Sequence, residues 1–281
     1  MACEMADELL YPVRVLHTGT WLPDDILIFE RPFVPFPAQV KQKVECRWML
    51  AEVMAQRQGV VMTRGTVRAG SSLYVKNDKL CLKYGTSDYG NAIGSTHPDV
   101  PEYHQHRFVG FMCVTCTSDG FLVYGVRGAI DWPYQCHVAP AGRWSTKQES
   151  PVAGIKAEFK EELGVHPDEI LDLQCIAVIA DDTIGRMNFE FVFTANVLLT
   201  FTELRQRAFS AKSKSEHVQL LPVGIEDVET LIMSAPYKWV PTGFAGMALR
   251  SRRSTNSASV VDWTSVADMT YESFMTKAMG Q

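Results

Sequence analysis

Hydrophobic and polar residues alternate at helical spacing in the middle of the chain, between Ser150 and Gly164. The apolar positions fall on one stripe, formed by Val152, Ile155, Phe159 and Leu163. Ser150 can cap the N-terminus, Pro151 sits where a first-turn proline is tolerated, and Gly164 suits the C-terminal stop. We therefore predict a helix that begins after Ser150, ends before Gly164 and packs one face on a sheet.

Elsewhere the pattern changes to short apolar runs separated by turn residues, which predicts strands. The predicted strands cover residues 26–29, 60–66, 72–75, 80–84, 108–115, 121–126, 170–180, 190–197 and 217–223. Further helices are predicted over residues 39–56 and 225–234, with turns at 117–120 and 181–186. Residues 90–106, rich in Gly, Pro and His, are predicted to form a loop, and residues 251–281 a linker and a terminal helix.

The polar side of the predicted central helix carries three acids, Glu158, Glu161 and Glu162. At about 100° per residue they fall within a sector of about 100° on the helix surface. Like charges at this spacing repel one another, so a helix that keeps them together usually has a cation to neutralise them. Oxygen-rich clusters of this kind suit Mg²⁺ or Mn²⁺, which in turn attract phosphate oxygens.

A bare run of acids on a helix is more often a solvated surface than a site. Here a glycine-containing loop and a separate acid, Glu149, precede the helix. Together they favour an active site over a solvated charge run.

The segment 142–165 resembles the Nudix box, Gly-x5-Glu-x7-Arg-Glu-U-x-Glu-Glu-x-Gly-U, where U is a bulky aliphatic residue. The matching positions are Glu149, Glu158, Phe159, Glu161, Glu162, Gly164 and Val165. Two positions depart from the motif. Six residues instead of five separate Gly142 from Glu149, and Ala157 replaces the arginine that in the family pairs with the first glutamate and steadies the loop.

The resemblance implies an α/β fold, the Nudix α/β/α sandwich with a mixed sheet. It also implies a Mg²⁺ (or Mn²⁺) site in which Glu158, Glu161, Glu162 and the backbone carbonyl of Gly142 are the ligands. In many members the general base is a glutamate outside the box. Glu216 is the first candidate for that role, with Glu190 second, although an exposed acid is more often only solvated.

Residues 82–96 resemble, more weakly, a segment of the larger Nudix proteins that hydrolyse UDP-sugars. In those a glycine and a Thr-Ser precede a tyrosine, and a Gly-Thr pair follows. Here Asp88 displaces the tyrosine and Ser95 splits the Gly-Thr pair. The alternative is a polar turn between domains with no ligand.

Four further residues are candidates for substrate binding. Arg127 and Arg143 could reach phosphate oxygens, and Tyr84 and Tyr89 could stack on a base or a sugar. For each the alternative is a surface charge or a core aromatic. The histidines at 104, 106 and 137 lack metal-ligand spacing and are interpreted as structural.

Length and composition limit the size of the core and the number of domains. At 281 residues, with 46% hydrophobic and 21% charged residues, the chain can bury a large core. A typical Nudix domain needs about half of this length, so we expect an N-terminal α+β subdomain (1–103), a Nudix domain (104–250) and the terminal segment (251–281). The seven cysteines, an odd number, are expected to be reduced core thiols.

The net charge of −5 argues against nucleic acid as a partner. The Arg-rich stretch 250–253 is interpreted as part of a solvated linker. There is no apolar run of about 18 residues and no signal-peptide pattern, so we expect a cytoplasmic protein without a membrane partner. A monomer and a homodimer both remain open.

Three functions therefore stay open. The first is a Mg²⁺-dependent hydrolase of a small-molecule diphosphate, with UDP-sugars first in line. The second is a prenyl diphosphate hydrolase, because the aromatic and Met-rich composition could line an apolar pocket as well as fill a core. The third is a Nudix module that binds nucleotides or a protein without catalysis, motivated by Ala157 and the shifted Gly142.

Overall fold

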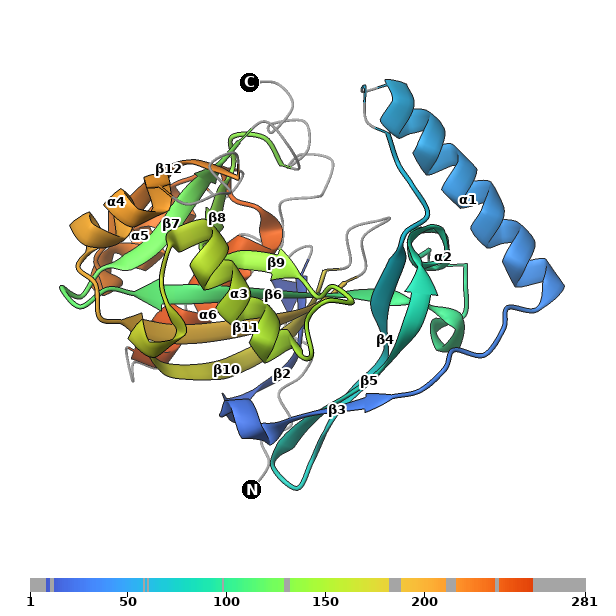
Figure 1. Ribbon diagram of the computed structural model, residues 1–281, viewed down its shortest axis with the longest axis horizontal. Helices are drawn as coiled ribbons and strands as arrows, with labels where there is room; N and C mark the ends of the chain where they lie inside the picture. Colours follow the sequence, from blue (N-terminus) through green and yellow to red (C-terminus); the bar gives the residue numbers. More distant parts are fainter. Residues whose placement is uncertain are drawn as a thin grey trace.

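The computed structural model describes residues 9–10, 13–57, 59, 61–97, 99–128, 132–181, 188–210, 216–235 and 238–254. In this part of the chain twelve strands form one curled sheet, shown in Figure 1. Its main path runs in the order β1 (Leu9–Leu10), β2 (Val13–Trp21), β10 (Ile170–Asp181), β11 (Asn188–Val197), β6 (Arg107–Cys116), β4 (Thr66–Lys76), β5 (Lys79–Asp88) and β3 (Ile26–Glu30).

Four further strands lie off this path. They are β7 (Leu122–Arg127), β8 (Cys136–Val138), β9 (Ala141–Arg143) and β12 (His217–Val223). The sheet is mixed, because β6 runs parallel to β11 and β3 parallel to β5, while the other pairs are antiparallel. β9 pairs with β6, the most buried strand of the sheet, so Gly142 and Arg143 of β9 lie beside β6.

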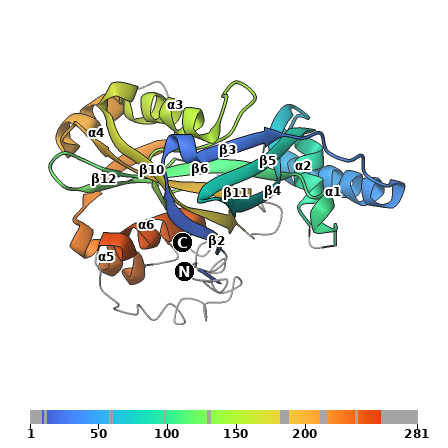
Figure 2. The ribbon, with the colours of Figure 1, turned by 90° about the horizontal axis from the view of Figure 1, so that it is seen from below.

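Helices cover both faces of the sheet, as Figure 2 shows. On one face lie α3 (Pro151–Leu163) and α4 (Phe201–Ser210), and on the other α5 (Val228–Ser234) and α6 (Pro241–Ser254). The side chains of β6 alternate between the two layers. Phe111 belongs to the apolar cluster under α3, and Met112 to the cluster under α6. The predicted α/β class and the sandwich with a mixed sheet are thereby confirmed.

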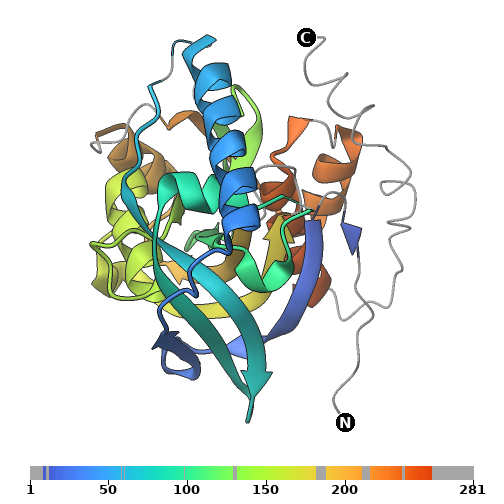
Figure 3. The same ribbon diagram turned by 90° about the vertical axis from the view of Figure 1, so that its right-hand side faces the viewer.

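The N-terminal residues add a lobe to one end of the sandwich. β4 and β5 form a hairpin that joins the sheet where Ala69 and Gly70 pair with β6. The long helix α1 (Ala38–Arg57) packs on the short α2 (Tyr89–Ser95); it stands at the right-hand edge of the molecule in Figure 1 and in front of the other elements in Figure 3. The division at residue 103 stays a prediction. In the structure β2, from the first unit, pairs with β10 of the second.

Most predicted elements are present, with some corrections. Residues 61–65 form no strand, and the single strand β4 begins at Thr66 and contains the strand expected over 72–75. The expected loop 90–106 contains α2 and a 3₁₀ turn. The Arg-rich stretch 250–253 is not a linker but the last part of α6, and residues 255–281 lie outside the described residues. The strands β1, β2, β8 and β9 and the helices α4 and α6 were not predicted.

No helix in the described ranges combines the length and the apolarity needed to cross a membrane.

Candidate active site

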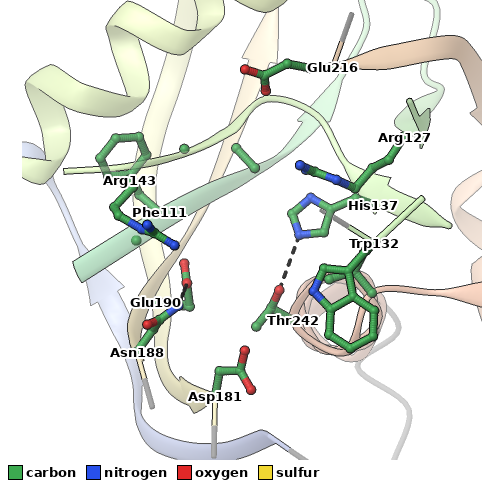
Figure 4. A pocket seen from close by; sticks show the side chains of 14 residues that line it. Phe111, Arg127, Trp132, His137, Arg143, Asp181, Asn188, Glu190, Glu216 and Thr242 are labelled. Atoms are coloured by element: carbon green, nitrogen blue, oxygen red, sulfur yellow. Dashed lines mark hydrogen bonds between the residues drawn. The ribbon is translucent and has the colours of Figure 1, made fainter. Parts of the chain in front are cut away.

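A cavity of about 260 Å³ opens where β9, the ends of β10 and β11 and the start of α6 meet. Figure 4 shows its side chains. It is lined by Gly110, Phe111, Arg127, Trp132, His137, Ala141, Gly142, Arg143, Asp181, Asn188, Glu190, Glu216, Val240 and Thr242. Five residues named as candidates from the sequence therefore line one cavity: Gly142, Glu216, Arg127, Arg143 and Glu190, the second candidate for the general base.

The helix that carries the three acids forms as the sequence predicts. The Ser150 hydroxyl accepts a hydrogen bond from the Ala153 amide at 3.0 Å, which caps the N-terminus. Gly164 ends the helix in the left-handed region, at a φ of 65°. The apolar stripe is buried, and Gly154 lets the helix approach the ring of Phe111 so closely that a Cβ there would overlap it. These contacts fix the direction in which the acids project.

Glu158 lies against the backbone of Gly142. A Cβ at Gly142 would overlap the Glu158 carboxylate, so only glycine leaves room for this side chain beside β9. Glu158 is half-buried. Glu158 is not itself a lining residue of the cavity, but it touches the strand residue that is.

Glu162 is buried, with 6% of its surface exposed. One carboxylate oxygen accepts a hydrogen bond from the Ala141 amide at 3.4 Å and lies 3.7 Å from Nδ1 of His217. The other oxygen, Oε1, is buried without a hydrogen-bond partner. A buried carboxylate oxygen in this state is unfavourable unless another group binds it. Glu161, by contrast, is exposed.

Glu216, the residue before β12, also lies beside Glu162 and the cavity. The antiparallel pairing of β7 with β12 places His217 opposite Arg127, and the Gly128 amide donates a hydrogen bond to the Glu216 carbonyl at 2.8 Å. The Glu216 side chain lines the cavity and lies close enough to Glu162 to influence its pKa. We call Glu158, Glu162 and Glu216 the acid cluster. Lys212 and Lys214, expected to keep Glu216 ionised, lie outside the described residues.

The acid cluster is electrostatically crowded. Burial, followed by the charges of Glu216 and Glu161, raises the pKa of Glu158 to about 7. Burial, followed by the nearby Glu216 carboxyl and the charge of Glu158, raises the pKa of Glu162 well above its usual value. His217 is a poor counterion, because burial and then Arg127 lower its pKa to about 4 and it stays neutral at pH 7.

A divalent cation fits this chemistry. The donor set is made of carboxylate oxygens, which hard cations prefer, and one of them, Oε1 of Glu162, is buried without a partner. Within the described ranges no three His, Cys, Asp or Glu side chains already converge as a ligand set. The fit therefore rests on the kind and the crowding of the donors, and the predicted roles of Gly142, Glu158, Glu161 and Glu162 as ligands stay predictions.

The loop before α3 is held without the arginine of the motif, whose place Ala157 occupies. The Trp144 indole donates a hydrogen bond to the Gln148 carbonyl at 3.0 Å. Arg68 of β4 donates one to the Glu149 carbonyl at 3.2 Å, and its guanidinium lies 4.8 Å from the centre of the Trp144 ring. A residue of the N-terminal lobe thus supports the loop.

The two predicted phosphate-binding arginines face the cavity from different strands. Arg143, at the end of β9, is exposed and its guanidinium lies 4.4 Å from the centre of the Phe108 ring. Arg127, at the end of β7, is half-buried. Both lie in the lining of the cavity in Figure 4, where a phosphate could meet them.

The two predicted tyrosines are placed differently. Tyr84 is buried, and its ring centre lies 4.6 Å from that of Trp144 in the loop before α3. Tyr89 packs against Phe108, with ring centres 5.2 Å apart. Neither lines the cavity, so both belong to the support of the loop and of β6 in this structure. Their contact with a substrate stays a prediction.

Several lining residues were missed from the sequence. Asp181, Asn188, Trp132 and Thr242 were not considered, and His217 was read only as a strand residue. Asp181 is the first residue of a predicted turn and Asn188 follows that turn, so a polar pair at the ends of two apolar strands was the available signal. His137, interpreted as structural, has partners for both ring nitrogens, the Val138 carbonyl at 2.8 Å and Thr242 Oγ1 at 3.2 Å.

Comparisons with known proteins add little. No family model matches the sequence, and no curated protein matches it. Among solved structures, the crystal structure of DR0079 from Deinococcus radiodurans is similar over 59% of this chain and 89% of its own, at 16% identity and a TM-score of 0.37. The MutT protein from Methanosarcina mazei Go1 is similar over 54% of this chain and 96% of its own, at 14% identity and a TM-score of 0.36.

Proposed function

We propose that this protein is a divalent-metal-dependent hydrolase of the Nudix type that cleaves the diphosphate linkage of a nucleoside diphosphate derivative, with UDP-sugars as the first substrates to test. The observation that carries the proposal is the acid cluster. Glu158 and Glu162 are crowded beside Gly142 and Glu216, and Oε1 of Glu162 is buried without a partner.

The carboxylates of Glu158 and Glu162, with Glu161 and the Gly142 carbonyl, would hold the cation. A bound Mg²⁺ or Mn²⁺ supplies charge neutralisation at the diphosphate and lowers the pKa of a bound water. The protein contributes the rigid positions of the donors. The caps of α3 and the contact between Gly154 and Phe111 fix the helix that carries them.

Glu216 is the proposed general base. It lies at the cavity wall, close to Glu162. Its carboxylate is therefore placed to take a proton from a water next to the cation site. Arg127 and Arg143 line the same cavity and would bind the non-bridging phosphate oxygens. Both would orient the diphosphate and offset part of its negative charge.

The cavity favours a polar substrate over a prenyl diphosphate. Beyond the arginines its wall is formed by Asp181, Asn188 and Glu190, to which an apolar prenyl chain would offer no hydrogen-bond donors. The weak UDP-sugar resemblance of residues 82–96 points the same way, and Tyr84 of that segment packs on Trp144 of the loop before α3.

A panel assay tests the proposal. The purified full chain is incubated with UDP-glucose, UDP-galactose, ADP-ribose and farnesyl diphosphate, with and without Mg²⁺, and the products are identified by mass spectrometry. We expect metal-dependent release of a nucleoside monophosphate and a sugar phosphate from the UDP-sugars. Absence of monophosphate from every compound at any Mg²⁺ or Mn²⁺ concentration contradicts hydrolysis. Tight binding of the same compounds without turnover would assign the chain to the non-catalytic binding class.

A further inference from the structure

The far wall of the cavity is a set of hydrogen-bond acceptors at the ends of two paired strands. Asp181 is the last residue of β10 and pairs directly with Asn188, the first residue of β11, and Glu190 follows two positions later on the same face. All three line the cavity. We call them the acceptor wall. In Figure 4 Asp181 lies at the bottom of the view and Glu216 at the top.

Asn188 is the residue of the acceptor wall that most clearly indicates a ligand. Only 5% of the residue is exposed, and its Nδ2 donates a hydrogen bond to Glu190 Oε1 at 3.2 Å. Its Oδ1 is buried and has no hydrogen-bond partner. The amide is therefore fixed in direction by its nitrogen, while its oxygen is left for a donor that the described protein residues do not supply.

Glu190 is placed by a glycine. A Cβ at Gly110 of β6 would overlap the Glu190 carboxylate, so this side chain lies across the neighbouring strand and extends the acceptor wall toward β9. Three interstrand spacings, together roughly 14 Å, separate β10 from β9. A diphosphate held at Arg143 and Gly142 therefore leaves room for one further ring between it and Asp181.

The remaining neighbours are of the kind that binds sugars. Thr242, at the start of α6, adds a hydroxyl, and the half-buried Trp132 adds an aromatic face on the other side of the cavity in Figure 4. A carbohydrate ring offers hydroxyl donors to carboxylate and amide oxygens and an apolar face to an aromatic ring. A nucleobase offers fewer donors, and a prenyl chain none.

We propose that the acceptor wall binds the hydroxyls of a sugar ring attached to the diphosphate, and that Asn188 is the residue that selects for them. The proposal rests on the proposed function for the position of the diphosphate. The ring is either the glycosyl group or the ribose of the substrate, since each is attached to one end of the diphosphate and carries hydroxyl groups.

The test compares UDP-glucose with two analogues, UDP-2-deoxyglucose and the 2′-deoxyuridine form of UDP-glucose, in the wild type and in Asn188→Ala. We expect the wild type to prefer UDP-glucose over one analogue by roughly 10-fold or more in kcat/KM, because a site built around a hydroxyl rejects a ligand that lacks it. In Asn188→Ala that preference should fall toward one, with KM rising more than kcat falls. The analogue that is rejected identifies the ring.

Asn196→Ala is the matched control. Asn196 is at the other end of β11, exposed, and bonded to Asp172 at 3.0 Å, so its loss should leave the preference unchanged. If Asn188→Ala does not fold, the analogue series on the wild type still decides. Equal kcat/KM for all three compounds in the wild type overturns the proposal.

Calorimetric binding of the same three compounds separates this proposal from the proposed function. Selective binding of UDP-glucose without any hydrolysis would retain the acceptor wall and remove the catalytic assignment. Hydrolysis of all three compounds with equal affinity would retain the catalytic assignment and remove the acceptor wall.

Discussion

The acid cluster and the acceptor wall are built alike, since each places a glutamate across a strand glycine, yet they differ in what surrounds the oxygens. Glu158 lies over Gly142 and meets two more carboxylates. Glu190 lies over Gly110 and meets the amide of Asn188, which already donates to it. The carboxylates of the acid cluster repel one another unless a cation binds between them. The oxygens of the acceptor wall instead require hydrogen-bond donors from a ligand.

This difference separates the two parts of the proposed reaction. Changes in the acid cluster should act on metal affinity and on kcat, while changes in the acceptor wall should act on KM and on the choice of substrate. The acid cluster lies against β9 and the acceptor wall against β6, and these two strands are paired. Matched substitutions on the two strands can therefore show whether metal binding and substrate choice are separate.

The largest effect is expected from Glu162→Gln. Burial raises the pKa of Glu162 well above its usual value and so favours the neutral carboxyl, which glutamine imitates, so the fold should be retained. Without the anionic ligand we expect kcat to fall by about 10³-fold or more. Steady-state kinetics at saturating Mg²⁺, with the melting temperature as a check on folding, measure it.

Glu229→Gln is its control. Glu229 is exposed on α5, in the layer on the opposite face of the sheet, and the substitution makes the same change of charge. Activity should remain at the wild-type level. A Glu162→Gln variant that turns over as fast as Glu229→Gln removes the metal assignment.

The next effect concerns pH. Because the folded-state pKa of Glu158 is about 7, against an ordinary value of 4.5, the folded protein binds more protons than the unfolded chain between these values. The metal-free protein should therefore lose stability as the pH rises from about 4.5 to 7. Mg²⁺ must displace the same proton, so its apparent affinity should rise by up to about tenfold per pH unit below pH 7.

Melting temperatures at pH 5 and pH 8, with and without Mg²⁺, measure this linkage. Burial and the charges of Glu216 and Glu161 all raise the pKa of Glu158, and His217 remains neutral over most of the range because its pKa is about 4. Mg²⁺ should stabilise the protein more at pH 8 than at pH 5. A Mg²⁺ affinity that is flat with pH would show that the acids do not hold the ion.

A pair of glycine substitutions sharpens the comparison directly. Gly142→Ala places a methyl group against the Glu158 carboxylate, and Gly110→Ala places the same group against Glu190. We expect Gly142→Ala to lower Mg²⁺ affinity and kcat by about tenfold, because metal geometry is exacting. Gly110→Ala should instead raise KM for the UDP-sugar several-fold and leave Mg²⁺ affinity unchanged. If both variants change the same parameter, the two walls are one functional unit.

The sequence was a good guide where one element contains its own signals. The helix α3 has its cap, its stop and its apolar stripe within fifteen residues, and all of them are found in the structure. The hairpin strand β7 and the strands β10, β11 and β12 were likewise readable from local patterns. Gly142 and Glu216 were found through the resemblance rather than through local physics.

The rest depends on contacts that local patterns do not contain. The 14-residue helix α6 contains Gly243 and Gly246, which lower its intrinsic helix propensity. Its stability therefore comes from packing, with Gly246 lying against Met112 of β6. The acceptor wall exists only because the register of β10 and β11 brings Asp181 opposite Asn188. Such pairings are set by the sheet as a whole, and a single sequence does not state them.

The smallest expected effect comes from Arg68, which connects the lobe to the loop before α3. Arg68→Ala removes its hydrogen bond to the Glu149 carbonyl and its contact with the Trp144 ring, and should lower the free energy of unfolding by about 1–2 kcal/mol. Because the loop leads into the helix that carries Glu158, kcat should fall only a few-fold. Lys83→Ala, which removes a similar contact with Tyr74 in the same hairpin, is the control.

Hydrogen exchange distinguishes a local role of Arg68 from general destabilisation. In Arg68→Ala the amides of residues 144–149 should exchange faster than those of β10, whereas Lys83→Ala should leave that loop protected. Arg68→Lys should be intermediate, since lysine keeps the charge but not the planar group that stacks on Trp144. Equal protection of the loop in all three variants would mean that the loop needs no support from the N-terminal lobe, and that the loss of the motif arginine at Ala157 is tolerated for another reason.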